Sequence, residues 1–497
     1  DPGSSSGLDS LLSYTFATTG TYYIAVRSWS GSLGSGASYM LNVSLSSAST
    51  PGTGYAGSQL YGDGGNDTLR SGRGNDTLDG GTGTDSVSYG EASSAVTVNL
   101  SLAGQQNTGG GGVDTLNNIE NLTGSNYNDT LTGNATANSL VGGAGNDTLL
   151  GGGGDDLLRG ASGNDTIDGG SGSDTAYYNE ASTGVTVNLS LAGPQNTGGA
   201  GIDALVGVEN LVGTNFDDFL SGDAGGNILR GLLGNDTLNG AAGIDTASYV
   251  DATSAVTVNL SLVGPQNTIG AGTDTLIAIE NITGSAYNDT LTGDGGANAL
   301  VGGAGADLLN AGGGNDGLRG GAGDDRLDGG AGVDTVYYGD SSAGVVVSLL
   351  VTGSQNTIGA GTDTLIAIEN ITGSAYNDTL TGDGGANALV GAAGNDVLNG
   401  GDGADILNGG SGNDTLDGGA ATDTASYSDA TAAVTVNLSL AGAQNTGGSG
   451  NDTLIGLENL TGSAYNDVLT GNGEANVLTG GAGRDTLTGG GGADRFR

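Results

Sequence analysis

The feature that most constrains this chain is a nine-residue repeat, which is clearest between Leu122 and Ile167. There the units are LTGSNYNDT, LTGNATANS, LVGGAGNDT, LLGGGGDDL and LRGASGNDT, and IDGGSGSDT follows. Each unit opens with a large aliphatic residue, continues with glycine-rich sequence, and carries Asp or Asn two residues before the next opener. Because a fixed period places every opener on the inside, the repeat predicts a stacked solenoid rather than a globular domain.

A longer repeat shows how many units make one coil. The tag GSxxNDTL, or a close variant, recurs at intervals of 89, 71, 89 and 89 residues, beginning at Gly124, Gly213, Gly284, Gly373 and Gly462. The short interval is smaller than the others by two of the nine-residue units. Such a deletion leaves every other residue on its original face, whereas the loss of a single unit would exchange the two faces. We therefore expect a two-sided solenoid in which two nonapeptides make each coil.

Composition excludes several classes of protein. Only 35% of the chain is hydrophobic, with 105 Gly and 4 Pro, which argues against a conventional core and against collagen. The net charge of −44 would suit a disordered chain, but disorder gives no reason for strict aliphatic spacing. The absence of Cys and His removes thiol nucleophiles, Ser–His pairs and His-bound metals. A pI of 4.1 argues against nucleic acid as a partner, and no apolar run suits membrane insertion.

The first 50 residues differ from the repeats. Leu11–Phe16, Thr21–Arg27 and Tyr39–Leu45 are rich in alternating, β-branched or aromatic residues, which predicts three strands. The stretch SYTFATTGTYYIAVRSWSGSLGSGASYMLNVSL resembles the end of a bacterial pre-peptidase C-terminal domain, a small β-sandwich found on secreted proteins. Three strands have too little core to stand alone, so we expect this partial sandwich to pack on other residues. Residues 51–59 then form a linker, and residues 60–497 form the repeats.

Each long unit also contains a different segment, such as VTVNLSLVGPQNTIGAGTDTLIAIEN at Val256–Asn281. Its apolar residues alternate as one strand face as far as Leu262, and the openers that follow Pro265 are Leu276 and Ile282. These two steps together fall one residue short of a coil, so we expect one structural coil with redistributed turns. We expect five tyrosines to stack nearby: Tyr89, Tyr178, Tyr249, Tyr338 and Tyr427. About 25 coils would then form a rod of roughly 120 Å.

The sixth residue of each GGxGxD turn is an aspartate. We expect its carboxylate to face the same turn of the next coil, one strand spacing away. Two carboxylates at that distance repel each other unless a cation lies between them. Carboxylate and carbonyl oxygens suit Ca²⁺, whereas Mg²⁺ needs a tighter octahedron and zinc prefers Cys or His.

Gly142–Asp174 and Gly302–Asp334 resemble the nonapeptide repeats of RTX proteins, the hemolysin-type calcium-binding family. The resemblance covers residues 60–497 and implies an all-β fold, a parallel β-roll with calcium in the turns between coils. It also implies type I secretion and folding in external calcium. The calcium ligands that it implies are aspartates at equivalent turn positions, completed by turn carbonyls. They are Asp67, Asp76, Asp85, Asp147, Asp156, Asp165, Asp174, Asp236, Asp245, Asp307, Asp316, Asp325, Asp334, Asp396, Asp405, Asp414, Asp423 and Asp485.

Two kinds of turn depart from this pattern. Asn replaces the Asp in one turn of each long unit, where we expect weak calcium binding or none: Asn138, Asn227, Asn298, Asn387 and Asn476. The preceding turn lacks its second and fourth glycines, and its Asp is expected with equal weight to bind calcium or its own turn backbone. These aspartates are Asp129, Asp218, Asp289, Asp378 and Asp467. The recurring Asn-Asp-Thr sequons are expected to follow from turn chemistry rather than from glycosylation.

Three functions stay open, and all require calcium-coupled folding by on the order of 15–20 ions. The first is a secreted structural rod at a bacterial cell surface, in an adhesin, surface layer or filament, with self-association. The second is the non-catalytic region of a type I secreted protease or lipase. An HExxH site is impossible without His, and we expect no catalytic site in this chain. The third is an ice- or glycan-binding face built on the outward Thr of each NDT.

Overall fold

The computed structural model describes residues 57–497. The predicted sandwich at residues 1–50 lies outside the described residues, and the predicted linker is described only from residue 57. Within the described part the chain forms 50 strands, most of them three residues long. No helix in this part is long and apolar enough to cross a membrane.

Twenty of the strands pair in parallel in one continuous sheet along the whole roll. In the second long unit these are β8 (Asn121–Thr123), β10 (Ser139–Ala144), β12 (Leu157–Ser162), β14 (Thr175–Tyr177) and β18 (Asn210–Val212). Leu140 pairs with Leu122 on one side and Leu158 on the other, each two nonapeptides away along the chain. The predicted parallel β-roll with two nonapeptides per coil is therefore confirmed.

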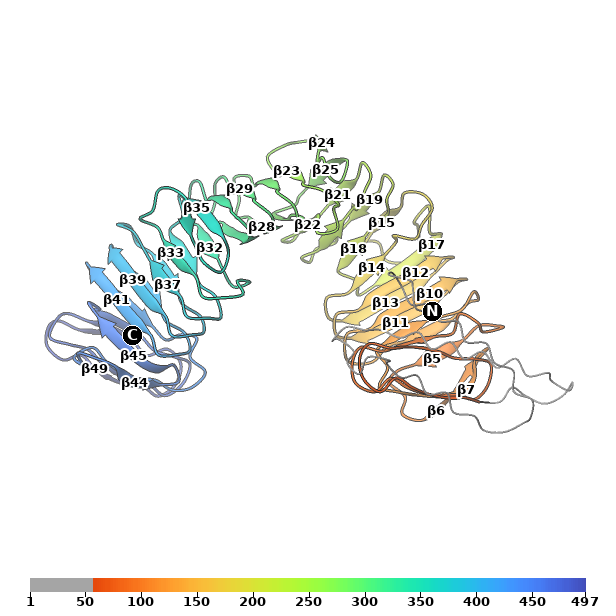
Figure 1. Cartoon of the computed structure of the whole chain (residues 1–497), viewed down its shortest axis with the longest axis horizontal. Helices are drawn as coiled ribbons and strands as arrows, with labels where there is room; N and C mark the ends of the chain where they lie inside the picture. Colours follow the sequence, from red (N-terminus) through yellow and green to blue (C-terminus); the bar gives the residue numbers. More distant parts are fainter. Residues whose placement is uncertain (1–56) are drawn as a thin grey trace, which may run out of the picture.

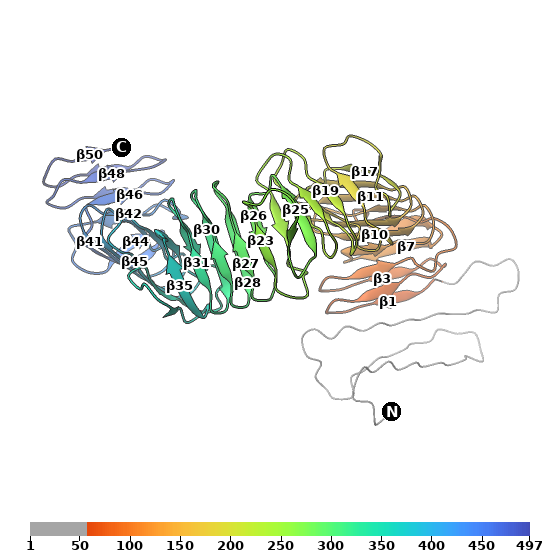
Figure 2. The same cartoon turned by 90° about the horizontal axis from the view of Figure 1, so that it is seen from above.

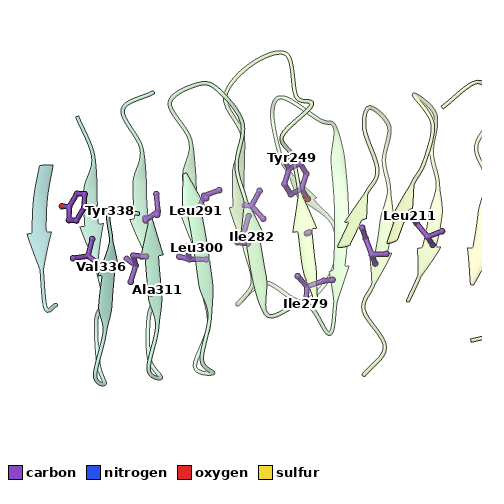
Figure 3. Close-up of a cluster of buried hydrophobic side chains, with 14 of the residues drawn as sticks. Leu211, Tyr249, Ile279, Ile282, Leu291, Leu300, Ala311, Val336 and Tyr338 are labelled. Atoms are coloured by element: carbon purple, nitrogen blue, oxygen red, sulfur yellow. The ribbon is translucent and has the colours of Figure 1, made fainter. Parts of the chain in front are cut away.

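The opposite face of the roll is divided into six smaller sheets. Between β8 and β14 its strands are β9 (Thr130–Thr132), β11 (Thr148–Gly153) and β13 (Thr166–Ser171), again paired at a distance of two nonapeptides. The openers of both faces point inward, and Leu131, Leu140 and Leu149 are fully buried. Figure 3 shows the same arrangement further along, with Leu291 and Leu300 between the two faces.

The interposed segments form wedges rather than single coils. In the second unit the wedge contains β15 (Thr186–Asn188), β16 (Gln195–Asn196) and β17 (Ile202–Val206). Strand β17 pairs in parallel with β13, while β16 runs antiparallel to β17 and β15 pairs with the next coil at β19 (Phe219–Ser221). On the continuous sheet, however, β14 pairs directly with β18. The single-coil prediction is wrong because the chain folds back as a hairpin, which the spacing of openers does not reveal.

The wedges bend the roll. Between β13 and β19 the divided face has three strands, β17, β16 and β15. Over the same coils the continuous sheet has one, β18, between β14 and β20 (Ile228–Arg230), so the divided face becomes the longer one. Figure 1 shows the resulting arch, with β17, β25 (Thr273–Ile277) and β35 (Thr362–Ile366) on its convex side and β14 and β18 on its concave side. The view from above in Figure 2 shows the strands following one another along the roll without a break. Each coil contributes one strand to the continuous sheet, which has 20 strands, so the roll has fewer coils than the 25 expected. At ~4.8 Å per strand the continuous sheet extends for about 90 Å rather than the roughly 120 Å expected.

The wedge also corrects one detail of the expected strand face. Val256 and Val258 are buried on either side of Thr257 in β23 (Thr257–Asn259), as alternation predicts. Leu262 is instead 49% exposed, because the strand ends at Asn259 and the chain turns there. The alternation in the sequence therefore continues past the end of the strand.

Candidate metal sites in the turns

The turns between the two faces form two edges. On the first edge the turns lead into the continuous sheet, as at Asp156 and Asp174. On the second edge they lead into the divided face, as at Asp147 and Asp165. Of the eighteen aspartates expected to bind calcium, all are buried except Asp67 and Asp485, which lie near the two ends of the roll.

The aspartates form a hydrogen-bonded ladder along each edge. Oδ1 of Asp147 accepts a hydrogen bond from the backbone N–H of Asp129 at 2.7 Å, and Oδ1 of Asp165 accepts one from Asp147 at 2.8 Å. On the first edge, Asp174 accepts the N–H of Asp156 at 2.7 Å in the same way. Oδ1 thus faces the preceding coil, not the following one as expected.

The second carboxylate oxygen is the unusual feature of these turns. In 16 of the eighteen aspartates Oδ2 is buried and has no hydrogen-bond partner among the described residues. The exceptions are Asp485 and Asp76. Oδ2 of Asp76 accepts hydrogen bonds from Ser71 Oγ at 3.2 Å and from the N–H of Gly72 at 3.0 Å. Buried carboxylate oxygens without donors are costly, so their regular repetition points to a missing positive partner.

Glycines shape the space around each such oxygen. A Cβ on Gly151 would collide with Oδ2 of Asp156 and with the carbonyl oxygen of Gly169 on the next coil. A carboxylate and a carbonyl oxygen therefore converge where only glycine leaves room. Gly143 and Gly145 of the preceding turn have φ of 111° and 130°, a backbone region that other residues rarely adopt.

The electrostatics of the turns oppose ionised carboxylates. Burial, the largest cause, raises the pKa of Asp147 to about 6, that of Asp165 to about 7 and that of Asp236 to about 8. Neighbouring ladder carboxylates raise these pKa values further, while the backbone N–H groups lower them. Ion pairs lie outside these turns, at Arg159–Glu180, Arg230–Asp251 and Arg326–Asp328.

The donor set of these turns fits calcium. Every available group is an oxygen, from a carboxylate or a backbone carbonyl, which is the ligand that a hard cation prefers. No group of three or more acidic side chains converges within residues 57–497. Carbonyl oxygens such as that of Gly169 would therefore have to complete each coordination shell.

The asparagine turns satisfy themselves without a cation. Oδ1 of Asn138 accepts the N–H of Asn134 at 2.7 Å, and Nδ2 donates to the carbonyl oxygen of Glu120 at 2.7 Å. The amide N–H thus contacts a carbonyl oxygen directly, and no unpaired carboxylate remains. Nδ2 of Asn227, Asn298, Asn387 and Asn476 makes the equivalent bond.

The aspartates of the preceding turns are also fully hydrogen-bonded. Oδ1 of Asp129 accepts the N–H of Val96 at 2.7 Å and Ser125 Oγ at 2.8 Å, and Oδ2 accepts the N–H of Ser125. Asp218, Asp289, Asp378 and Asp467 repeat these bonds with a Ser or Thr. Of the two expectations held for this turn, the hydrogen bonds match the one in which Asp binds its own backbone.

Each wedge contributes a buried aspartate that sequence reasoning missed. Oδ1 of Asp114 accepts the N–H of Asp76 at 2.8 Å and so extends the ladder, while Oδ2 accepts Thr108 Oγ1 at 3.0 Å and Tyr89 OH at 3.1 Å. Burial raises the pKa of Asp114. The equivalent residues are Asp203, Asp274, Asp363 and Asp452. The tyrosines expected to stack instead lie buried with their hydroxyl groups near these carboxylates.

A wedge glutamate extends the first edge. Oε2 of Glu120 accepts the N–H of Asp85 at 2.7 Å, and Glu209, Glu280, Glu369 and Glu458 do the same for the aspartates of their units. A sequence signal existed for both classes, because Asp-Thr-Leu or a variant and a later Glu-Asn recur in every interposed segment. Both were overlooked because they lie outside GGxGxD turns.

The outward threonines do not form one continuous row. On the divided face Thr130, Thr148 and Thr166 align, but the next strand presents Ala204 at that position. In the fourth unit the equivalent positions include Leu308 and Arg326. The wedges and these substitutions therefore limit any flat threonine array to a few coils.

The fold and its turns define a parallel β-roll with acidic, glycine-lined edges. The chain matches the family model for the RTX calcium-binding nonapeptide repeat over ten stretches that together span most of the roll, and it belongs to this family, which binds multiple Ca²⁺ ions. The stretches are residues 54–92, 117–149, 141–176, 212–247, 279–309, 310–341, 366–398, 390–425, 446–458 and 461–496. A comparison with curated proteins gives no significant match.

Proposed function

We propose that this chain is the calcium-folded structural region of a secreted bacterial protein, and that it forms a curved spacer in an adhesin, surface layer or filament. The observation that carries the proposal is the row of buried Oδ2 atoms without donors along both edges. The chain carries 54 acidic and 10 basic residues, so its own side chains cannot neutralise these rows.

Calcium would couple folding to the environment. In its absence, ionised carboxylates would have to be buried unpaired, at a cost of several kcal/mol each. The chain would therefore stay open where calcium is scarce. Because the sites exist only in the folded roll, calcium-binding free energy acts as folding free energy. This suits a protein that leaves the cell unfolded and folds outside it.

The ladder aspartates are the residues that would hold the ions, together with turn carbonyls such as that of Gly169. Bound calcium supplies positive charge between carboxylates of neighbouring coils. The chain's own contribution is to place Oδ2 by anchoring Oδ1 to a backbone N–H, as Asp147 and Asp165 do. Glycine then keeps the space beside each Oδ2 open.

Electron microscopy with and without calcium tests the proposed spacer. We expect elongated, curved particles in calcium and no such particles after chelation. In calcium, a variant carrying Asn at Asp147, Asp156, Asp165 and Asp174 should be less ordered at these coils than the wild type, because it lacks the carboxylates that would hold the ions. A variant with Asp63→Asn and Asp251→Asn, at exposed sites outside the ladders, serves as a control. Curved particles of unchanged length after chelation would overturn calcium-coupled folding, and isolated monomers at every concentration would overturn filament or layer assembly.

A further inference from the structure

One turn in each long unit carries an exposed aromatic side chain at the same position. All five lie on the second edge and are 46–49% exposed. They are Tyr127, Phe216, Tyr287, Tyr376 and Tyr465. Half-exposed aromatic rings at equivalent positions in five repeats are not explained by the core, which is filled by the aliphatic openers.

These aromatic turns differ from the GGxGxD turns, which carry the ladder aspartates and are called ion-type turns below. In GSNYND, Tyr127 stands where the next ion-type turn has Gly145, and Ser125 stands where that turn has Gly143. Both of those glycines have positive φ, whereas Tyr127 does not. The turn therefore has a different backbone conformation, and the substitution removes two glycines and adds an aromatic ring.

The aromatic turn is held rigidly by its own aspartate. Ser125 Oγ donates to Oδ1 of Asp129 at 2.8 Å and accepts the N–H of Tyr127 at 3.2 Å. The other four units have the same Ser or Thr bond to the aromatic N–H, at 2.9–3.1 Å. The carboxylate that holds an ion elsewhere here fixes the turn that carries the ring. A ring on a preorganised turn loses little entropy when it binds.

A second, independent feature is connected to two of the aromatic turns. Ile269 and Ile358, at the tips of two wedge hairpins, have φ of 64° and 66° and are 66% and 63% exposed. The other three hairpins have glycine at this position. A β-branched residue with positive φ is strained, and such strain is kept mainly where it serves a function. Val256, which bridges Ile269, donates its N–H to Asp289 in the turn of Tyr287, so the hairpin tip is connected to the aromatic turn by backbone pairing.

We propose that this aromatic edge binds an extended polysaccharide of uncharged hexoses, whose sugar rings stack on the aromatic side chains. The proposal requires the calcium-folded roll but not its surface role. An exposed Asn follows the ring in four of the five turns, and Asp217 follows Phe216. Asn128 uses its Oδ1 to accept the N–H of Asn146, which leaves its amide nitrogen to donate to sugar hydroxyl groups.

The spacing of the rings favours a polymer with a short repeat of its own. Successive rings are separated by three or four strand steps along the continuous sheet, about 14–19 Å, and by more along the divided face. The order of the intervals, 89, 71, 89 and 89 residues, changes when the chain is reversed. In a two-fold antiparallel pair with a second copy, some rings would therefore have no ring opposite them. A polysaccharide can meet rings at any of these intervals. The net charge of −44 disfavours an anionic polymer.

Affinity gel electrophoresis in calcium tests the proposal, with hydroxyethylcellulose, β-1,3-glucan or dextran in the gel and alginate as the anionic comparison. The main variant replaces all five aromatic residues with Ala. The matched control is Tyr61→Ala with Tyr337→Ala, which removes exposed tyrosines that lie off this edge. Circular dichroism verifies folding, and Tyr127→Ala with Tyr465→Ala serves if the five-fold variant does not fold.

We expect at least one uncharged polymer to retard the wild-type chain and its control, with at least tenfold weaker retardation for the five-fold variant. Five weak contacts on one polymer reinforce each other, so retardation of the double variant should lie between that of the wild type and that of the five-fold variant. Retardation by alginate alone, by none of the polymers, or equally for all variants overturns the proposal. Sedimentation that shows a dimer in the wild type and a monomer in the five-fold variant assigns the edge to a second copy instead.

Discussion

Replacing a ladder aspartate by asparagine should have opposite effects in the presence and absence of calcium. Asp165 illustrates this, because its Oδ1 accepts the N–H of Asp147 while its Oδ2 has no partner. Its pKa is raised from 3.8 to about 7, mainly by burial. At ~1.4 kcal/mol per pKa unit, ionising it at pH 8 in the calcium-free roll costs on the order of 4 kcal/mol. Asn138 shows that the neighbouring edge accepts an amide at this position without a cation.

Asp165→Asn should therefore stabilise β11 and β13 in chelator by a few kcal/mol and make their protection less dependent on calcium. Asp129→Asn is the matched control on the same edge. It exchanges an acceptor oxygen for an N–H₂ group that faces Ser125, and so should destabilise the roll by about 1–3 kcal/mol with or without calcium. Hydrogen exchange of peptides spanning residues 121–171, followed through a calcium titration, measures both. Equal calcium dependence in Asp165→Asn and the wild type would refute the reasoning.

Three further outcomes follow from the same structure. Calcium-free protein should gain stability as the pH falls from about 8 to about 4, because the folded-state pKa of the ladder aspartates is raised to about 6–8. The folded roll then binds protons that the unfolded chain releases, so circular dichroism of dialysed protein should show more β signal at the lower pH, and no gain on mild acidification would contradict this. Tyr338→Phe removes a 3.2 Å hydrogen bond to Asp363 and should cost about 1–2 kcal/mol in local exchange stability. Unchanged exchange in the surrounding coils would contradict this role of the hydroxyl group. Deleting residues 177–211 removes one wedge and leaves Ile167 and Leu220 at the regular spacing of one coil. Small-angle scattering should then show a straighter roll, and an unchanged curvature would contradict the idea that the wedges bend it.

Sequence periodicity was sufficient to predict the register of the roll. The deletion of two nonapeptides identified the coil, because only a whole coil can be lost without exchanging the faces, and the pairing of Leu140 with Leu158 follows. The inward direction of the openers was equally predictable. These features follow from spacings along the chain, so a single sequence contains them.

The wedges could not be predicted in the same way. In the interposed segment, strand order depends on a hairpin that folds back beside the preceding coil, as β17 does against β13. Opener spacing records distance along the chain but not reversal of direction. The curvature of the arch follows from that reversal and was therefore missed together with it.

The direction of the carboxylates marks a second limit. The spacing of Asp147 and Asp165 placed them on one edge, but only the backbone geometry shows that Oδ1 is anchored and Oδ2 is not. Asp114 was missed because its sequence context is not a glycine turn. Its place in the ladder follows from the pairing of Leu78 with Leu116 across the wedge.

Calcium-coupled folding is tested most directly by circular dichroism of the chain at pH 8, before and after addition of calcium to chelator-treated protein. We expect a β signal only in calcium, and elemental analysis of the gel-filtered folded protein should find on the order of 15 calcium ions per chain. An unchanged β signal in excess chelator would contradict the coupling of ion binding to folding.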